Sequence, residues 1–145
     1  MAIKPIQIVP DPVLRKIAEP VEIITDETKQ MLDDMAQTMY DAPGIGLAGP
    51  QIGALKRLIV MDCSRDDEAD ELWQMINPEI THFSEETALL EEGCLSIPGH
   101  NAEVTRPAWV ELRFLDIKGE AQQIKAEGLL AACVQHEIDH LNGVL

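Results

Sequence analysis

The sequence predicts an α+β fold in which helices near the two ends of the chain flank a strand-rich middle. Apolar residues recur at helical spacing over residues 25–41 and again after Ala126, whereas residues 57–116 contain short apolar or alternating runs. We expect mixed or antiparallel sheets around a C-terminal helix, with a longer helix near the N-terminus. No repeat, low-complexity stretch or linker divides the 145 residues, so one domain over residues 1–145 is expected.

Two helices are predicted in the N-terminal third of the chain. An Asp-Pro pair at residues 11–12 is typical of an N-cap with proline at the first helical position, so a short helix is expected over residues 13–18. A longer helix is expected over about residues 25–41, and a Pro-Gly pair at residues 43–44 ends it. The apolar face of this helix, which we interpret as core, consists of Met31, Leu32, Met35 and Met39.

Four strands and a final helix are predicted in the rest of the chain. The strands are expected at Leu58 to Met61, Leu72 to Ile76, Thr87 to Leu90 and Trp109 to Leu115. A turn is expected around Gly119. Helical patterning returns after Ala126 in Leu129, Leu130, Cys133, Val134, Ile138 and Leu141. Gly143 is placed to end this last helix.

Charge and cysteine content restrict the partners and the compartment. The chain has 26 acidic and 11 basic residues, a net charge of -15, so phosphate backbones and anionic membrane surfaces would repel it. No leader and no apolar run of about 20 residues is found, so we expect a cytoplasmic protein without direct nucleic-acid or membrane binding. Cys63, Cys94 and Cys133 are odd in number and far apart, so we expect reduced thiols that are available to a metal.

The last predicted helix contains HEIDH, which matches the metal-binding pattern HExxH. His136 and His140 are four residues apart, so both imidazoles lie about 40° apart around the helix axis and can reach one ion. Glu137 is close enough to take a proton from a bound water and pass it to a leaving nitrogen. Asp139 falls on the side away from the metal and receives no catalytic role. The motif alone also fits a surface helix with two solvated histidines.

Two histidines leave a catalytic ion short of the usual three protein ligands. Only five residues follow His140, and none of them is His, Asp, Glu or Cys. The protease pattern HExxHxxGxxH is matched as far as Gly143, but its third histidine would be residue 146, one past the last residue. The upstream candidates are Cys133, Cys94, Cys63, His82, His100 and several carboxylates.

The positions of two of these cysteines in the predicted elements indicate whether each can serve as the third metal ligand. Cys133 lies a further turn along the helix, and we interpret it as a buried thiol. Cys94 follows Gly93 in a tight, non-helical segment that can present a thiolate to a helix packed against it.

Three motifs resemble, in order and spacing, the signatures of peptide deformylases. They are GIGLAGPQ at residues 44–51, EGCLS at residues 92–96 and HEIDH at residues 136–140. The resemblance runs from the Pro-Asp-Pro at residues 10–12 to the last residue. Many bacterial members continue past HLNGVL into a C-terminal extension, so the chain resembles a short form that ends just after HExxH.

The resemblance implies a hydrolase that removes the formyl group from N-formylmethionyl peptides, with metal-bound hydroxide as the nucleophile. It implies that Cys94, His136 and His140 hold one divalent ion, Fe²⁺ in the cell, with Zn²⁺, Ni²⁺ or Co²⁺ as substitutes. Glu137 is then the general acid and base. Gln51 and the backbone N–H of Leu95 are the implied donors to the oxyanion.

The resemblance also implies a substrate-binding set. It comprises Gly44, Ile45, Gly46, Glu92, Gly93 and Arg106, and the backbone near Ile45 and Gly46 pairs with an extended peptide as an added strand does. Glu92 and Arg106 are expected to form an ion pair that orients the cysteine segment or a histidine. The implied partners are nascent chains at the ribosome, and a monomer is expected. A metalloprotease and a non-catalytic metal-binding domain are the alternatives.

Overall fold

Two antiparallel sheets make up most of the structure. The computed structural model describes residues 3–8, 11–42, 44–64, 71–94 and 96–144. In this part of the chain a five-stranded sheet has the order β1-β2-β3-β6-β7, and β4 pairs with β5 in a second sheet. The strands are β1 (Gly46–Ala48), β2 (Leu58–Met61), β3 (Trp73–Phe83), β4 (Thr87–Cys94), β5 (Ile97–Pro107), β6 (Trp109–Leu115) and β7 (Ala121–Glu127). Pairing between these strands is antiparallel throughout, which confirms the predicted α+β class.

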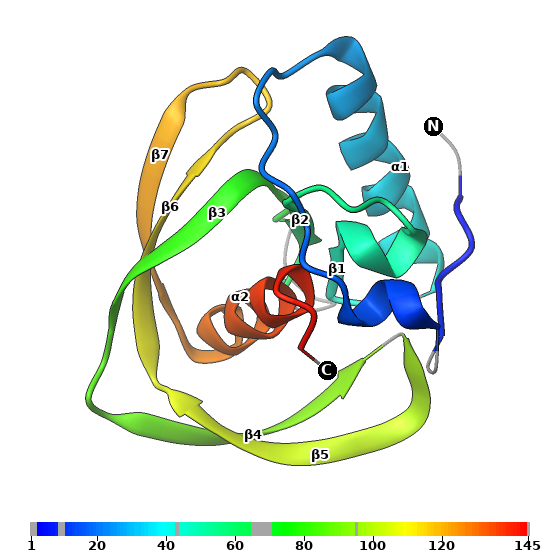
Figure 1. Ribbon diagram of the computed structural model, residues 1–145. Helices are drawn as coiled ribbons and strands as arrows, with labels where there is room; N and C mark the ends of the chain where they lie inside the picture. Colours follow the sequence, from blue (N-terminus) through cyan, green and yellow to red (C-terminus); the bar gives the residue numbers. More distant parts are fainter. Residues whose placement is uncertain (1–2, 9–10, 43, 65–70, 95, 145) are drawn as a thin grey trace.

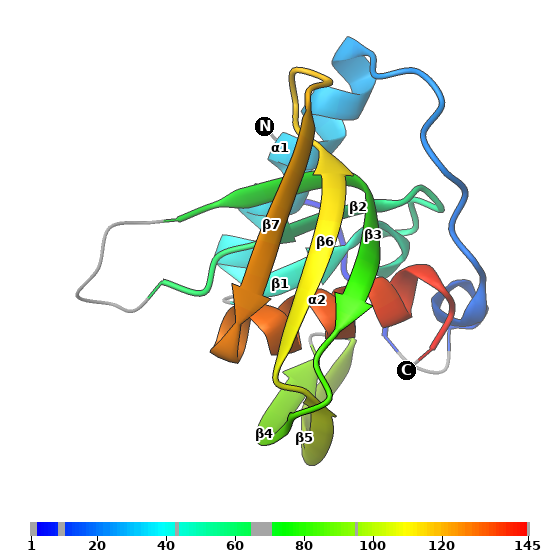
Figure 2. The ribbon, with the colours of Figure 1, turned by 90° about the vertical axis from the view of Figure 1, so that its left-hand side faces the viewer.

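The C-terminal helix α2 (Gly128–Leu141) lies inside the fold, where it contacts strands of both sheets. Figure 1 shows α2 with β3, β6 and β7 on one side and the β4–β5 pair on another, and Figure 2 shows the large sheet in front of it. Its apolar residues share one core cluster with the sheet, which includes Val134, Ile138, Leu141, Met75, Val110, Leu112 and Phe114. The helix that carries HEIDH is therefore fixed by packing along most of its length.

Helix α1 (Asp26–Asp41) covers the other side of β1 and β2. It begins at the N-cap Thr25, whose side chain and that of Thr28 each accept a hydrogen bond from the other's backbone N–H. The predicted apolar stripe is confirmed as core, because Leu32, Met35 and Met39 are fully buried. Strand β2 is thus buried on both faces, with Ile59 and Met61 in the α2 cluster and Leu58 and Val60 in the α1 cluster.

The C-terminal end of α2 is held by segments from the first half of the chain. Ala18 N donates to the carbonyl of Leu141, and the Arg57 guanidinium donates to the carbonyls of both residues. Gly143 has φ +76, and a Cβ there would lie 2.5 Å from the Arg15 carbonyl oxygen. The glycine therefore ends the helix, as predicted, and allows the N-terminal segment to approach it.

Several element boundaries differ from the prediction. The first helix is a 3-10 helix, η1 (Pro12–Arg15), and ends before Ala18, because Lys16 is extended and Ala18 pairs with α2. Strands β3 and β4 run past their predicted ends to Phe83 and Cys94. Strands β1, β5 and β7 were not predicted. Neither helix in the described residues has the length and apolar character needed to cross a bilayer.

Candidate metal centre

Three potential metal ligands come together between the two sheets. The Sγ of Cys94 lies 3.2 Å from the Nε2 of His140, which lies 3.0 Å from the Nε2 of His136. All three ligand atoms are within 4.8 Å of one another. The structure therefore brings together the three residues that the family resemblance assigned to one ion.

Two different local structures place these ligands. His136 and His140 are one turn apart on α2, with ring centroids 4.6 Å apart. Cys94 is the last residue of β4, where the pairing with β5 shifts register between Gly93 and Cys94. Since a register shift of this kind re-aims the following side chain, it turns the thiol of Cys94 toward the helix.

Other candidate ligands lie elsewhere. His82 is exposed on β3 and pairs with Glu111. Cys133 is buried, with its thiol 3.7 Å from the Ile45 carbonyl oxygen, and Cys63 packs against the same core. A hydrogen bond with Cys63 and then burial raise the pKa of the Cys133 thiol, which supports its interpretation as a structural thiol. The side chain of His100 lies outside the described part of the chain.

The chemistry of the cluster fits a divalent transition metal. One sulfur and two imidazole nitrogens are the donors that zinc, iron, nickel and cobalt accept, and three protein ligands leave a fourth position open. The Nδ1 of His136 is hydrogen-bonded to Glu92 at 3.0 Å, so its Nε2 is left to bind the ion. Burial, followed by the charges of His136 and Arg106, lowers the pKa of His140 to about 4, which keeps this imidazole neutral and able to coordinate.

Glu137 is a buried carboxylate beside the cluster. Its Oε1 is 4.0 Å from the His136 Nε2, and its Oε2 has no hydrogen-bond partner among the described residues. Burial, with smaller contributions from Cys63 and Glu92, raises the pKa of Glu137 to about 8. A cation bound nearby would lower this pKa, so the group can both accept and release a proton near neutral pH.

Gln51 presents its amide to the same cluster from η2 (Gly49–Ile52). Its Oε1 accepts from Ala48 N at 2.8 Å, and its Nε2 donates to Ser96 Oγ at 3.1 Å and to Cys94 Sγ at 3.5 Å. These contacts hold the Gln51 amide beside the Cys94 thiol. Ser96, fully buried, was not singled out by the sequence, although it lies in the EGCLS motif. Leu95, the other predicted oxyanion donor, lies outside the described residues.

A pair of charged residues supports His136 from the second sheet. Arg106 on β5 donates to both carboxylate oxygens of Glu92 on β4, at 2.7 and 2.9 Å. Burial raises the pKa of Glu92, but hydrogen bonds and the charge of Arg106, with a smaller effect of His136, together hold it below its ordinary value. Glu92 is therefore ionised and can orient the imidazole. Arg106 also donates to Asp139, to which the sequence had given no role.

Of the predicted substrate-binding residues, Gly46 begins β1, the end strand of the five-stranded sheet in the described residues, and Gly44 and Ile45 directly precede it. Ile45 is 44% exposed, and its carbonyl accepts from Asp62 N on the β2 side. A Cβ on Gly46 would lie 2.7 Å from Cys133 Sγ and 3.1 Å from Glu137 Oε1. Gly44 N donates to the Met39 carbonyl at the end of α1. Strand β1 is thus close to Glu137, and among the described residues it pairs with a strand on one side alone.

A family comparison agrees with this geometry. The model of the polypeptide deformylase family matches residues 3–145. The chain belongs to this family. Polypeptide deformylases are metal-dependent enzymes, and Cys94, His136 and His140 form the cluster in this member that can bind the ion.

Relatives and solved structures of deformylases cover the whole chain. The peptide deformylase of Rhizobium meliloti (strain 1021) is 54% identical over 145 residues, which are all of this chain and 83% of the relative. The crystal structure of the Thermotoga maritima peptide deformylase is 39% identical, with a TM-score of 0.94 over 100% of this chain and 95% of that one. The Ehrlichia chaffeensis peptide deformylase in complex with actinonin is 40% identical, with a TM-score of 0.95 and coverage of 100% and 87%.

Proposed function

We infer that this chain is a metal-dependent hydrolase that removes the formyl group from N-formylmethionyl peptides. The observation that carries this conclusion is the Cys94, His136 and His140 cluster in a chain that a deformylase model matches almost end to end. A divalent ion in the cluster would supply Lewis-acid activation of water and of the formyl carbonyl. Family membership favours this function over a metalloprotease or a non-catalytic metal-binding domain.

The chain's own residues supply proton transfer and charge stabilisation. We propose that Glu137 accepts a proton from the attacking water and delivers it to the amide nitrogen as the C–N bond breaks, which yields formate and a free amine. The raised pKa of Glu137 supports this dual role. Gln51 Nε2 donates to the oxygen on which negative charge develops, and the backbone N–H of Leu95 is the proposed second donor.

The substrate is proposed to bind as an added strand along β1. An extended peptide would pair with the backbone of Gly44, Ile45 and Gly46, whose strand is at the end of the sheet. Gly93 is exposed on β4 next to Cys94, and we include it among the residues that would contact the substrate. Glu92 and Arg106 contribute through His136, which Glu92 contacts at 3.0 Å.

The metal and the cellular setting are further parts of this proposal. The donor set suits Fe²⁺ in the cell, with Zn²⁺, Ni²⁺ or Co²⁺ as substitutes. All three ligands come from one chain, which supports a working monomer. Nascent chains at the ribosome, in the cytoplasm, are the proposed source of substrate. Metal analysis of protein isolated without oxygen would contradict the choice of metal if it found another metal. Sedimentation would contradict the monomer if it found a dimer.

The assignment is tested by formate release from a formyl-Met peptide. Glu137→Gln should lower the rate by about 10²–10⁴-fold, because it removes the proton carrier, while the metal content stays at that of the wild type. Cys94→Ser should lose metal and activity together, whereas the half-buried Cys63→Ser serves as the matched control and should lose neither. Cleavage of internal peptide bonds that survives Cys94→Ser would indicate a metalloprotease. A wild type that binds metal but releases no formate would refute the proposed enzyme activity.

A further inference from the structure

A row of charged side chains connects the surface to the metal centre. Arg106 Nη1 donates to Asp139 Oδ2 at 3.0 Å, and its other nitrogens hold Glu92 at 2.7 and 2.9 Å. Glu92 in turn lies 3.0 Å from His136 Nδ1. Asp139 and His136, the two ends of the row, are three residues apart on α2, whereas Arg106 lies on β5 and Glu92 on β4.

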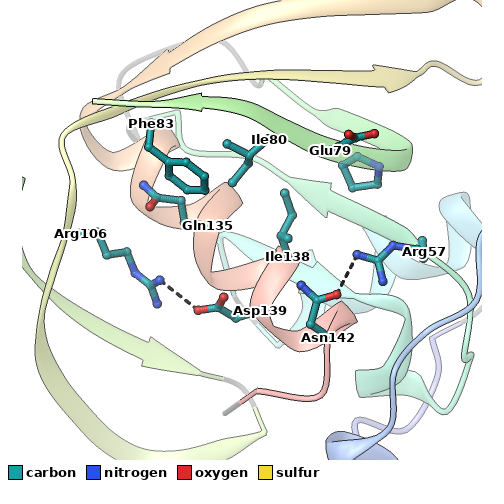
Figure 3. Close-up of a pocket in the computed structure, with 10 residues that line it drawn as sticks. Arg57, Glu79, Ile80, Phe83, Arg106, Gln135, Ile138, Asp139 and Asn142 are labelled. Atoms are coloured by element: carbon teal, nitrogen blue, oxygen red, sulfur yellow. Dashed lines mark hydrogen bonds and ion pairs between the residues drawn. The ribbon is translucent and has the colours of Figure 1, made fainter. Parts of the chain in front are cut away.

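The outer end of this row can be altered without opening the core. Side-chain exposure is 41% at Asp139, 18% at Arg106 and 11% at Glu92. Figure 3 shows Asp139 and Arg106 facing each other beside α2. Both residues line a cavity of about 320 Å³. A substitution at Asp139 therefore changes a partly solvated contact and leaves the packing beneath it in place.

The position of this contact matters because the metal ligands come from two separate elements. The β4–β5 sheet carries Cys94, and α2 carries both histidines. The ligand spacing therefore depends on how this sheet sits against the helix. Among the described residues, the hydrogen bond between His136 and Glu92 and the ion pair between Asp139 and Arg106 both connect this sheet to the helix. Both contacts meet at the Arg106 guanidinium, which also binds Glu92.

Arg106 can fix this arrangement only while both carboxylates hold it. A guanidinium is planar and rigid, so carboxylates on two different elements determine its orientation more fully than one does. If Asp139 lost its charge, Arg106 would keep Glu92 but would lose its ionic attachment to α2. The Glu92 carboxylate, and with it the His136 ring, would then be free to shift.

We propose that Asp139 is a positioning residue that acts through Arg106 and Glu92 to hold His136 and Cys94 at the spacing a divalent ion requires. The proposal rests on the proposed function only in taking the cluster as a metal site. It is independent of the substrate. Residues that orient metal ligands typically change metal affinity by about 10–100-fold when they are substituted. Because Asp139 acts through two intermediates, we expect the lower end of this range.

The test is the affinity of the metal-free protein for Zn²⁺, measured by competition with a chromophoric chelator. Asp139→Asn should bind about 10-fold more weakly than the wild type, and Asp139→Glu should recover most of the loss because it restores the carboxylate. Glu79→Gln is the matched control, since it breaks an equally short but exposed ion pair with Arg113 and should leave the affinity unchanged. Equal melting temperatures of the metal-free variants would show that each is folded.

A second arm asks whether the effect travels through Glu92. In a Glu92→Gln background, Asp139→Asn should cause no further loss of affinity, because the connection to His136 is already cut. An affinity of Asp139→Asn equal to the wild type, or the same loss in both backgrounds, would overturn the proposal. Formate release is measured separately. A wild type that binds Zn²⁺ normally but releases no formate would contradict the proposed enzyme activity without affecting this proposal.

Discussion

At the scale of single residues, the site depends on how closely the backbone at Gly46 approaches the buried carboxylate. A Cβ at this position would lie 3.1 Å from Glu137 Oε1 and 2.7 Å from Cys133 Sγ. Neither side chain has room to move away, because both are buried. The glycine therefore permits β1 and Glu137 to lie side by side.

Gly46→Ala should lower kcat for formate release by about 10-fold or more with a smaller change in KM, because a displacement of about 1 Å in a catalytic group can cost 10²-fold. Adding Cys133→Ala, which removes the nearer contact, should restore part of the rate. Steady-state kinetics on the single and double variants would check this. A single variant with normal kcat and a raised KM would show instead that the methyl group only blocks the peptide groove.

Local spacing identified the two histidines, and the family resemblance added residues that are distant in the sequence, such as Cys94 and Gln51. The contacts of Ser96 and Asp139 were not predicted by either. His136 and His140 are recognisable because four residues on a helix place them together. Ser96 and Asp139 carry no such signal. Ser96 meets Gln51 across 45 positions, and Asp139 meets Arg106 across 33. Pairings of this kind depend on how separate elements pack, which a single sequence does not display.

At the scale of elements, prediction succeeded where burial repeats regularly along the chain. Strands β2 and β6 were predicted to the residue, since their apolar residues form a continuous or alternating run. Strand β7 was not predicted, because it is largely exposed at the edge of the sheet and its sequence, AQQIKAE, has few apolar residues. Strand β1 has only three residues and begins with glycine, and β5 contains glycine, proline and polar residues that are common in loops. Their strand conformation comes from pairing with neighbours.

One contact between elements has a predictable dependence on pH. The Tyr40 hydroxyl, at the end of α1, donates to Asp62 Oδ2 at 2.6 Å, and Asp62 N donates to the Ile45 carbonyl beside β1. Burial raises the pKa of Asp62, but hydrogen bonds from Ser64 and Tyr40 together hold it below 3.8. This depressed pKa means that the ionised carboxylate stabilises the fold above pH 3.8 and that the contribution is lost as the pH falls below it.

Tyr40→Phe should lower the free energy of unfolding by about 1 kcal/mol at neutral pH, because it removes a hydrogen bond to a charged, mostly buried group. The deficit should shrink as the pH falls below 3.8, where Asp62 becomes protonated in the folded protein. Urea unfolding at neutral and acidic pH measures this deficit. Asp62→Asn, which lacks the charge, is the control background, in which the deficit should not depend on pH in this way. A deficit that is the same at every pH would contradict the assignment.

At the scale of the whole molecule, the three candidate metal ligands come from two different parts of the fold. Cys94 belongs to the two-stranded sheet, while both histidines belong to the helix packed in the core of the large sheet. An ion bound by both parts stabilises only the folded state, because Cys94 is far from the two histidines in the unfolded chain. Metal binding and the docking of the β4–β5 sheet are therefore thermodynamically linked.

Removal of the ion by a chelator should accordingly lower the melting temperature of the wild type. With free metal at 100 times its Kd, the stabilisation is about 2.7 kcal/mol, which corresponds to a shift of about 5–10 °C in a chain of this size. Calorimetry with and without chelator measures the shift. Cys63→Ser should behave as the wild type does, because its thiol lies outside the cluster, whereas Cys94→Ser should melt at nearly the same temperature in both conditions. An undiminished shift in Cys94→Ser would mean that the ion does not connect the two parts.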